Sequence, residues 1–416
     1  MMLKNIVQSL LSRGSVAGIN FLILLISSRY LGVSSRGEIS LLLLGISIMQ
    51  ALSGVYTGQS LVHFIPNENL SKLATGAVLF TLAASGICNV VLVMLHKQVP
   101  GYEWKAFLVA IIVIFNTFNC MVILGKGDFK MFNVFSVLQP LLLLVGLAYW
   151  IFIKQIYTFE SYFYPLVISF VVSVTLSSIL LLKYIVRGHS GQLFRTGSIL
   201  TSGFQYQVAL ILLLFCSRYC YYLLPDNANL GLYASAVTIT ESVLIIANGL
   251  GPLILSQSAN AENSELVGKK VLILGKAIFI CTLAGLILLC LMPDKAFVFL
   301  LGNGFRGIHH LTLAYAPAAL LMSLIIPLTA FFNGTGKQGT ILLAYLTGSL
   351  LAAVSAPALI SYAGATGAAF CTCCSFFVIT LILLLSFMKS NKMNFIILFA
   401  FKGNLKELKN QLFKSK

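Results

Sequence analysis

Long unbroken apolar segments limit this chain to very few folds. Runs such as 141–153 and 378–388 contain no charged residue and show no alternation of apolar and polar positions. A bilayer core of ~30 Å needs ~20 apolar residues per helix, and its lack of water forces backbone groups to pair within a helix or a closed barrel. Because barrel strands alternate apolar and polar residues, these runs predict an all-α polytopic membrane protein.

The composition agrees, because 59% of the 416 residues are hydrophobic and only 9% are charged, whereas about a quarter of a soluble domain is charged. The segments between the apolar runs are short and leave no room for a soluble domain. A window of membrane length predicts about twelve transmembrane helices, at 14–34, 38–62, 73–95, 105–124, 132–153, 162–185, 201–224, 230–256, 271–292, 311–332, 341–361 and 366–388.

The positive charges predict the orientation in the membrane. Most of the 27 Lys and Arg residues fall on one side if the N-terminus is cytoplasmic, and cytoplasmic loops normally carry this excess. Both termini are therefore expected in the cytoplasm, and Arg36 falls in an outer connection. Anionic lipids at the basic loops and at the tail 389–416, which we expect to lie on the membrane surface as a helix, explain the net charge of +16 without nucleic acid.

Two sequence echoes indicate an internal duplication. The triplet SRY ends one span at Arg29 and another at Arg218, and a glycine follows each, at Gly37 and Gly231. Later in each half, glycine pairs at 125–127 and 334–336 lie between the fourth and fifth helices. A tripeptide can recur by chance, but two echoes in the same order favour two six-helix lobes related by a parallel pseudo-repeat. The predicted divisions are lobes at 1–187 and 201–388, a basic cytoplasmic linker at 188–200 and the tail at 389–416.

Arg29 and Arg218 each follow a long uncharged run. Charges at membrane depth are costly and usually face protein or water. The planar guanidinium makes paired hydrogen bonds to phosphate oxygens and keeps its proton, so we predict that both arginines face a central cavity and clamp a diphosphate. The alternative is that each side chain extends to the outer interface.

Polar residues recur at helical spacing on the second and eighth spans and could wall a wet cavity. Tight packing of small residues is the alternative. The predicted cavity residues are Asn20, Ser47, Gln50, Thr57, Ser235, Thr238 and Asn248, with Gln205 and Gln207 as weaker candidates. Three nearby aromatic residues, Tyr219, Tyr221 and Tyr222, could serve as sugar platforms or as an interfacial belt.

Glu241 is the one acid that the predicted spans place well inside the membrane. It could carry H+ or Na+, or it could neutralise Arg218. We expect no cofactor. Transport could be coupled to the membrane potential, or to H+ or Na+ through Glu241.

Sequence patterns that are typical of enzymes occur in this chain, but the residues around them do not fit an enzyme site. The segments GNGFRG at 302–307 and GTGKQG at 334–339 match G-x-G-x-x-G, but they adjoin membrane helices instead of a strand–turn–helix unit. The CTCC stretch at 371–374 has no histidine or second cysteine pair nearby, so we expect no metal site. The sequence predicts a transporter without catalytic residues.

Several motifs resemble those of the Wzx-type polysaccharide repeat-unit flippases, which belong to the multidrug/oligosaccharidyl-lipid/polysaccharide exporter superfamily. They are the Arg-x-Leu-Gly at 29–32 followed by Gly37, and the stretches NLGLYASAVTITE at 229–241, LLGNGFRGIHHL at 300–311, FNGTGKQ at 332–338 and GATGAAF at 364–370. The family's cationic cavity would map here onto Arg29 and Arg218, which are fewer cations than we would expect for a pyrophosphate carrier.

The resemblance implies a bilobed flippase of the bacterial inner (cytoplasmic) membrane. It would move undecaprenyl-diphosphate-linked oligosaccharides to the periplasmic leaflet by alternating access, for O-antigen, capsule or exopolysaccharide synthesis. Polysaccharide polymerase or assembly proteins would be its partners. The rival functions are a cation-coupled drug exporter of the same superfamily, which would need several buried acids, and a glycan polymerase or ligase, which would need a large outer loop.

Overall fold

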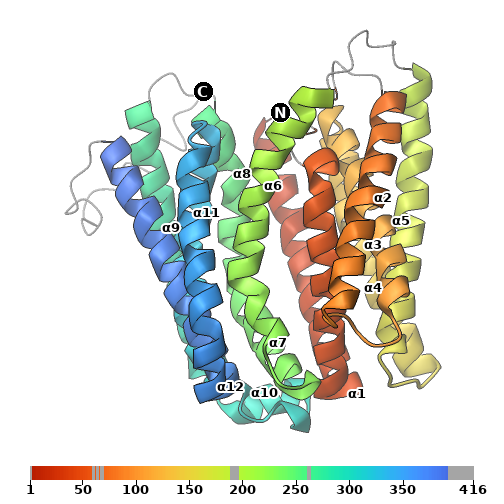
Figure 1. Ribbon diagram of the computed structural model, residues 1–416, viewed down its shortest axis with the longest axis vertical. Helices are drawn as coiled ribbons and strands as arrows, with labels where there is room; N and C mark the ends of the chain where they lie inside the picture. Colours follow the sequence, from red (N-terminus) through yellow and green to blue (C-terminus); the bar gives the residue numbers. More distant parts are fainter. Residues whose placement is uncertain are drawn as a thin grey trace. The chain divides into compact units, whose positions relative to one another are not determined.

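The computed structural model describes residues 2–58, 61, 65, 70–187, 196–259 and 264–391, and regular structure in these residues is entirely helical (Figure 1). Short 3-10 or π segments interrupt the helices at Tyr149–Ile153, Tyr219–Tyr222 (η3), Ser242–Leu244 (η4) and Asn303–Phe305. The α-helices are α1 (Met2–Thr57), α2 (Leu70–Met94), α3 (Glu103–Gly125), α4 (Phe129–Ala148), α5 (Glu160–Arg187), α6 (Thr196–Arg218), α7 (Asn227–Glu241), α8 (Ile245–Ala259), α9 (Ser264–Leu291), α10 (Asp294–Leu301), α11 (Ile308–Gly334) and α12 (Gln338–Ser390).

The two longest helices each contain two of the predicted spans. Helix α1 has 56 residues and α12 has 53, and each is broken at a glycine with non-helical angles, Gly32 (φ 81°, ψ 175°) and Gly364 (φ 56°, ψ −131°). Glycine accepts a positive φ because it lacks a Cβ atom. Nine segments of the described chain are long and apolar enough to cross a membrane, counting α1 and α12 once each. With those two divided and the 23-residue α6 added, the predicted number of about twelve spans is confirmed.

The break at Gly32 corrects the predicted position of Arg36. We expected the first two spans to be joined by a connection after residue 34, with Arg36 in it. Helical geometry instead resumes directly after Gly32, so Arg36 lies within α1 and its side chain is only 7% exposed.

The chain packs as two compact units. Unit 1 contains Met1–Thr238 and Pro293–His309, and unit 2 contains Ile239–Met292 and His310–Lys416. These bounds differ from those of the predicted lobes because α6 and most of α7 pack with the N-terminal helices. The predicted repeat stays a prediction, while most of its linker (188–195) and most of the basic tail (392–416) lie outside the described residues.

Unit 1 is built around α1, which contacts α2, α3, α4, α5, α6 and α10. Buried polar side chains join neighbouring helices in this unit, and such interhelical hydrogen bonds are favoured where water is scarce. They include Gln50 Nε2 to Thr117 Oγ1 (2.8 Å), Ser173 Oγ to Asn116 Oδ1 (2.7 Å), Asn119 Nδ2 to Ser177 Oγ (2.8 Å) and Gln139 Nε2 to Ser169 Oγ (3.1 Å).

The part of α1 after Gly32 crosses the start of α7 so closely that no side chain fits between the two backbones. A Cβ atom on Gly37 would lie 2.0 Å from the carbonyl oxygen of Asn227, and one on Gly231 would lie 1.9 Å from the carbonyl oxygen of Val33. Both distances are to backbone atoms, which cannot rotate away as a side chain can. Gly37 therefore packs against α7 and Gly231 packs against α1, both within unit 1. These are the two glycines of the sequence echo.

Unit 2 contains η4, α8, α9, α12 and most of α11. Helices α11 and α12 contact through the Thr329 and Tyr345 hydroxyls (2.8 Å) and through the rings of Phe331 and Phe387, whose centroids are 4.9 Å apart. Gly334 at the end of α11 packs on α8, where a Cβ atom would lie 2.7 Å from the carbonyl oxygen of Leu255.

Asp226 caps the N-terminus of α7, and its removal should weaken the contact between α7 and α1. Its Oδ1 accepts a hydrogen bond from the backbone N–H of Asn229 (2.7 Å), and this bond, with the Asn229 side chain, lowers the pKa of Asp226. We expect Asp226→Ala to reduce the free energy of unfolding by about 1 kcal/mol in thermal unfolding of the detergent-purified protein, whereas Asp226→Asn keeps a cap.

The pH dependence of this effect has a definite sign. A carboxylate with a lowered pKa in the folded state stabilises that state above its unfolded pKa, and the contribution is lost as the pH falls through the folded pKa. The stability difference between wild type and Asp226→Asn should therefore shrink on acidification. A difference that is constant with pH would show that the charge of Asp226 does not contribute.

Candidate substrate-binding site

Arg29 joins α1 to α10 within unit 1. Its Nη1 donates a hydrogen bond to the carbonyl oxygen of Phe299 (2.6 Å), and its guanidinium carbon lies 5.6 Å from the centre of the Phe299 ring. The Arg29 side chain is nevertheless exposed, so further guanidinium donors can reach a ligand. Its predicted role in a diphosphate clamp stays a prediction.

Arg218 is the last residue of α6 and lies against Tyr221 of η3. Its Nη1 donates to the Tyr221 hydroxyl (3.2 Å), and its guanidinium carbon is 5.4 Å from the centre of that ring. The Tyr221 ring in turn packs edge-on against Tyr233 of α7, at 5.7 Å between centroids. Because η3 directly follows α6, this contact joins the end of α6 to α7.

Arg36 is the buried cation that the sequence analysis misplaced. It directly precedes Gly37, which packs on Asn227 at the start of α7, and Arg218 contacts Tyr221, which packs on Tyr233 of the same helix. The Nε of Arg36 is buried without a hydrogen-bond partner, and no acid among the described residues forms an ion pair with it. A buried unpaired charge is costly, and the N-terminal end of the helix that restarts after Gly32 adds positive potential. Arg36 and Arg218 thus both lie close to the first turns of α7.

The sequence contained a signal for Arg36 that we did not use. Gly32 and Gly37 flank it closely, and a glycine that needs a positive φ can break a helix without a loop. A one-residue break would have placed Arg36 in the first turn of the second span. Its burial, however, depends on α5 and η3, which no local pattern predicts.

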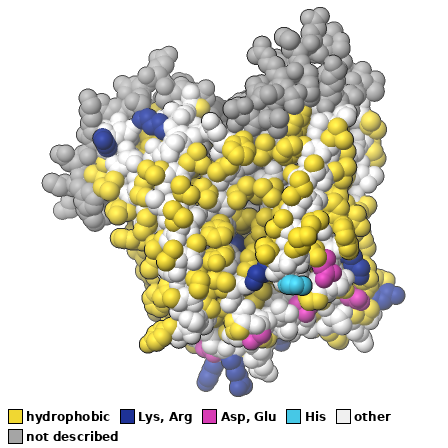
Figure 2. Space-filling model, in the orientation of Figure 1, with side chains coloured by type: hydrophobic (Ala, Val, Ile, Leu, Met, Phe, Trp, Pro, Cys, Tyr) yellow, Lys and Arg dark blue, Asp and Glu magenta, His cyan; other side chains and the backbone are white. Residues whose placement is uncertain are grey.

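Further cations and aromatic residues lie near the connection between the C-terminus of α2 and the N-terminus of α3. Lys97 lies over the Tyr222 ring and Lys105 over the Tyr102 ring, at 5.8 and 4.3 Å from the centroids. The pKa of Tyr102 is raised to about 12, mainly by burial and also by the hydrogen bond that its hydroxyl donates to Glu160 (3.2 Å). Figure 2 shows that most charged side chains on the visible face gather towards its lower end, below a flank that is largely hydrophobic.

Four of the seven predicted cavity residues form hydrogen bonds within their own helix or to a neighbouring one. The hydroxyls of Ser47, Thr57 and Thr238 donate to carbonyl oxygens of Leu43, Ser53 and Ala234, and Gln50 bonds to Thr117 on α3. These contacts are what helix packing requires, and a cavity role for these residues stays a prediction.

The remaining polar candidates differ in burial. Asn20 and Asn248 are exposed, and Ser235 is fully buried with a hydroxyl that has no partner among the described residues. Gln207 donates from Nε2 to the carbonyl oxygen of Gly54 (3.1 Å), which joins α6 to α1, and Gln205 is exposed.

Glu241 ends α7 and lies in unit 2, directly before η4. Its Oε1 accepts a hydrogen bond from the hydroxyl of Tyr315 (2.8 Å), a tyrosine that is fully buried. The change from α-helix to 3-10 helix after Glu241 turns its carboxylate towards α11. This acid is therefore anchored by a neutral donor, and its ion-coupling role stays a prediction.

Comparison with solved structures shows the fold. An inward-facing multidrug resistance MATE family transporter of the MOP superfamily matches 95% of this chain and 100% of its own (TM-score 0.69, 17% identity). An outward-facing MATE transporter matches 94% of this chain and 96% of its own (0.68, 17%), as does a MOP superfamily transporter from Pyrococcus furiosus (0.67, 16%), described by the reverse polarity of its binding pocket. No family model and no curated protein matches. The likeness confirms the predicted fold class, an all-α polytopic bundle of about twelve spans in two lobes.

Proposed function

We propose that this chain is a membrane transporter that moves an amphipathic substrate with an anionic group by alternating access. The fold supports transport, since solved structures that share it are described in inward-facing and outward-facing conformations. The anionic substrate rests on one observation: the guanidinium of Arg36 is buried, and no acid among the described residues forms an ion pair with it. A negative ligand would offset the desolvation of such a charge.

Within this class, an undecaprenyl-diphosphate-linked oligosaccharide fits the charges best. The guanidiniums of Arg36 and Arg218, both close to the first turns of α7, suit a diphosphate, and Arg29 would supply a third. The protein would then act in the bacterial inner membrane with both termini cytoplasmic, and would feed polymerases or assembly proteins of O-antigen, capsule or exopolysaccharide. Glu241, held by Tyr315, is the residue that we propose to exchange H+ or Na+ if the cycle is ion-coupled.

A cation-coupled exporter of small molecules or drugs is the second candidate, and the comparisons favour it. Solved structures with this fold include multidrug resistance MATE transporters. Glu241 is a carboxylate that could serve such a cycle, and Glu38, which the break at Gly32 places within α1, is a second. The Pyrococcus furiosus protein, described by a reversed pocket polarity, indicates that this fold accepts pockets of either charge.

One pair of assays separates the two functions. The gene is expressed in a flippase-deficient strain and, separately, in a drug-sensitive strain that lacks its exporters. Surface glycan, cytoplasmic-leaflet accumulation of lipid-linked units and drug resistance are scored for wild type, Arg218→Ala and Arg29→Ala. We expect restored glycan with wild type, and at least about a tenfold loss with Arg218→Ala, the size of one charged hydrogen bond.

The opposite pattern has a clear meaning. Drug resistance without glycan, unaffected by Arg218→Ala at equal protein levels, would support the exporter and refute the anionic substrate. Arg306→Ala is the matched control, because Arg306 is a surface arginine of unit 1 outside the candidate site.

A further inference from the structure

An apolar slot runs along one side of unit 1, over α1 and between α2 and α6. Its volume is about 900 Å³, and aliphatic and aromatic side chains form nearly all of its wall. The lining residues are Ile48, Leu52 and Val55 of α1, Phe80, Ala84, Ile87, Cys88, Val91 and Leu92 of α2, and Phe204 and Gln205 of α6. Water has few partners on such a wall, so hydrocarbon is the favoured occupant.

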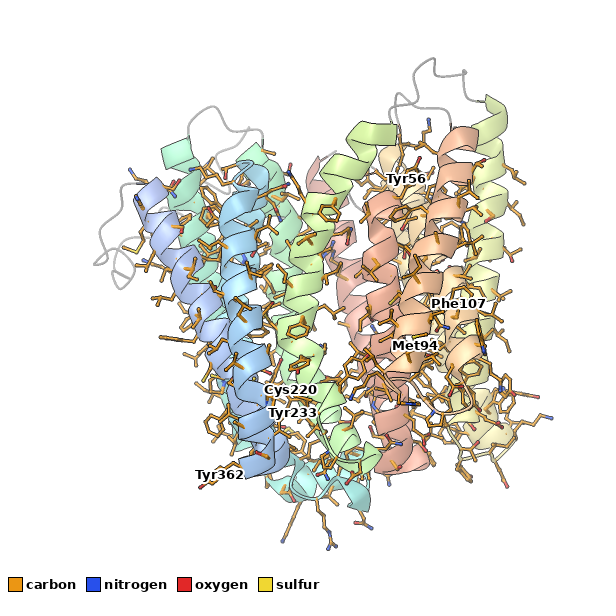
Figure 3. The ribbon with its side chains drawn as sticks, in the orientation of Figure 1. Tyr56, Met94, Phe107, Cys220, Tyr233 and Tyr362 are labelled. Atoms are coloured by element: carbon orange, nitrogen blue, oxygen red, sulfur yellow. The ribbon has the colours of Figure 1, made fainter. Side chains whose placement is uncertain are left out.

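The slot has the length of a lipid chain. Its lining on α2 extends from Phe80 to Leu92, and twelve helical steps cover about 18 Å. Its far end is closed at Phe80, whose ring stacks on Tyr56 at 6.0 Å between centroids. Figure 3 shows Tyr56 and Met94 towards opposite ends of α1 and α2, so the slot runs along the helices and not across them.

Its near end carries a cation. The Lys97 backbone N–H donates to the carbonyl oxygen of Leu92 (2.9 Å), which holds the lysine directly beyond the slot. Its Nζ donates to the carbonyl oxygen of Tyr222 (2.8 Å), which leaves two of the three ammonium donors unused. The Tyr222 ring packs against the cluster that contains Cys88 and Leu92, two residues that line the slot. A cation therefore lies where an apolar slot begins.

We propose that this slot binds one acyl chain of a membrane phospholipid, with the lipid phosphate held by the ammonium group of Lys97. A hydrocarbon slot with a cation at one end is complementary in shape and charge to a phospholipid and to neither water nor a free anion. The site lies wholly within unit 1 and is independent of the transported substrate. If the predicted orientation holds, this lipid belongs to the outer leaflet.

Native mass spectrometry of the full chain tests the site, with palmitoyl-oleoyl-phosphatidylglycerol titrated onto delipidated protein. We expect the first lipid molecule to bind to the wild-type protein more tightly than further molecules of the same lipid do. Lys97→Gln should raise its dissociation constant about tenfold, because a charged hydrogen bond to phosphate is lost. Ala84→Phe, which fills the slot, should lower the bound fraction several-fold even with Lys97 present.

Lys105→Gln is the control, since Lys105 lies over an aromatic ring at the same end of unit 1 but does not adjoin the slot. If Lys105→Gln and Lys97→Gln weaken lipid binding equally, the effect comes from general surface charge and the proposed site is wrong. Unchanged binding in Lys97→Gln and Ala84→Phe would overturn it as well, as would equally tight binding of glycerol phosphate, which has no chain. Elution volume and unfolding temperature confirm that each variant is folded, and Lys97→Gln, a change at a partly exposed side chain, remains decisive if Ala84→Phe unfolds.

Discussion

Gly231→Ala should destabilise the protein by about 3 kcal/mol or more, at the upper end of the cost of overpacking a core. The new methyl carbon would lie 1.9 Å from the carbonyl oxygen of Val33 and 2.8 Å from the backbone nitrogen of Gly37. Neither atom can turn away, so α7 must separate from α1 over its whole first turn. Gly231→Leu should prevent recovery of folded protein, as judged by size-exclusion chromatography with thermal unfolding.

Gly45→Ala is the matched control, because Gly45 lies in a helix interior as Gly231 does, in α1, but has nothing within 4 Å of its Cβ position. Alanine is favoured over glycine in a helix interior by roughly 0.5–1 kcal/mol, so this variant should be as stable as wild type or more stable. If Gly231→Ala unfolds at the wild-type temperature, the close crossing of α1 and α7 does not hold unit 1 together.

Arg36→Met should make the protein more stable and less active at the same time. The buried guanidinium has an Nε without a partner among the described residues, and exchange of a buried charge for an apolar side chain of similar length can stabilise a protein by about 1–4 kcal/mol. If the same charge receives the substrate's anionic group, transport should fall at least about tenfold. Thermal unfolding in nanodiscs and the glycan assay measure the two effects on the same preparations.

Arg36→Lys separates charge from shape. Lysine keeps the positive charge but not the planar fork, so we expect intermediate transport with little gain in stability. A loss of stability in Arg36→Met with transport unchanged would contradict the proposal and assign Arg36 to packing. Arg306→Met controls for removal of an arginine, since Arg306 is an exposed arginine of unit 1 outside the candidate site.

The fold was largely predictable because a bilayer imposes one strong rule on every span. The twelve predicted segments map in order onto the helices, and even the merged helices α1 and α12 break at glycines within or beside the predicted connections. Tyr221, for which the sequence left two roles open, is in the structure a contact of Arg218. Its surroundings come from η3 and α7, which side-chain periodicity does not place.

Apolar length and charge cost act along the chain, so the sequence alone predicts that it spans a membrane and how many times, but it misses Arg36 among the charges within the spans. The contacts of these charges come from the packed helices. Packing brings Arg29 to the backbone of α10, Arg36 and Arg218 close to the first turns of α7, and Glu241 to Tyr315. The physical reason is that such contacts depend on kinks at single glycines and on helix crossings between distant segments, where a one-residue shift moves a side chain to another face.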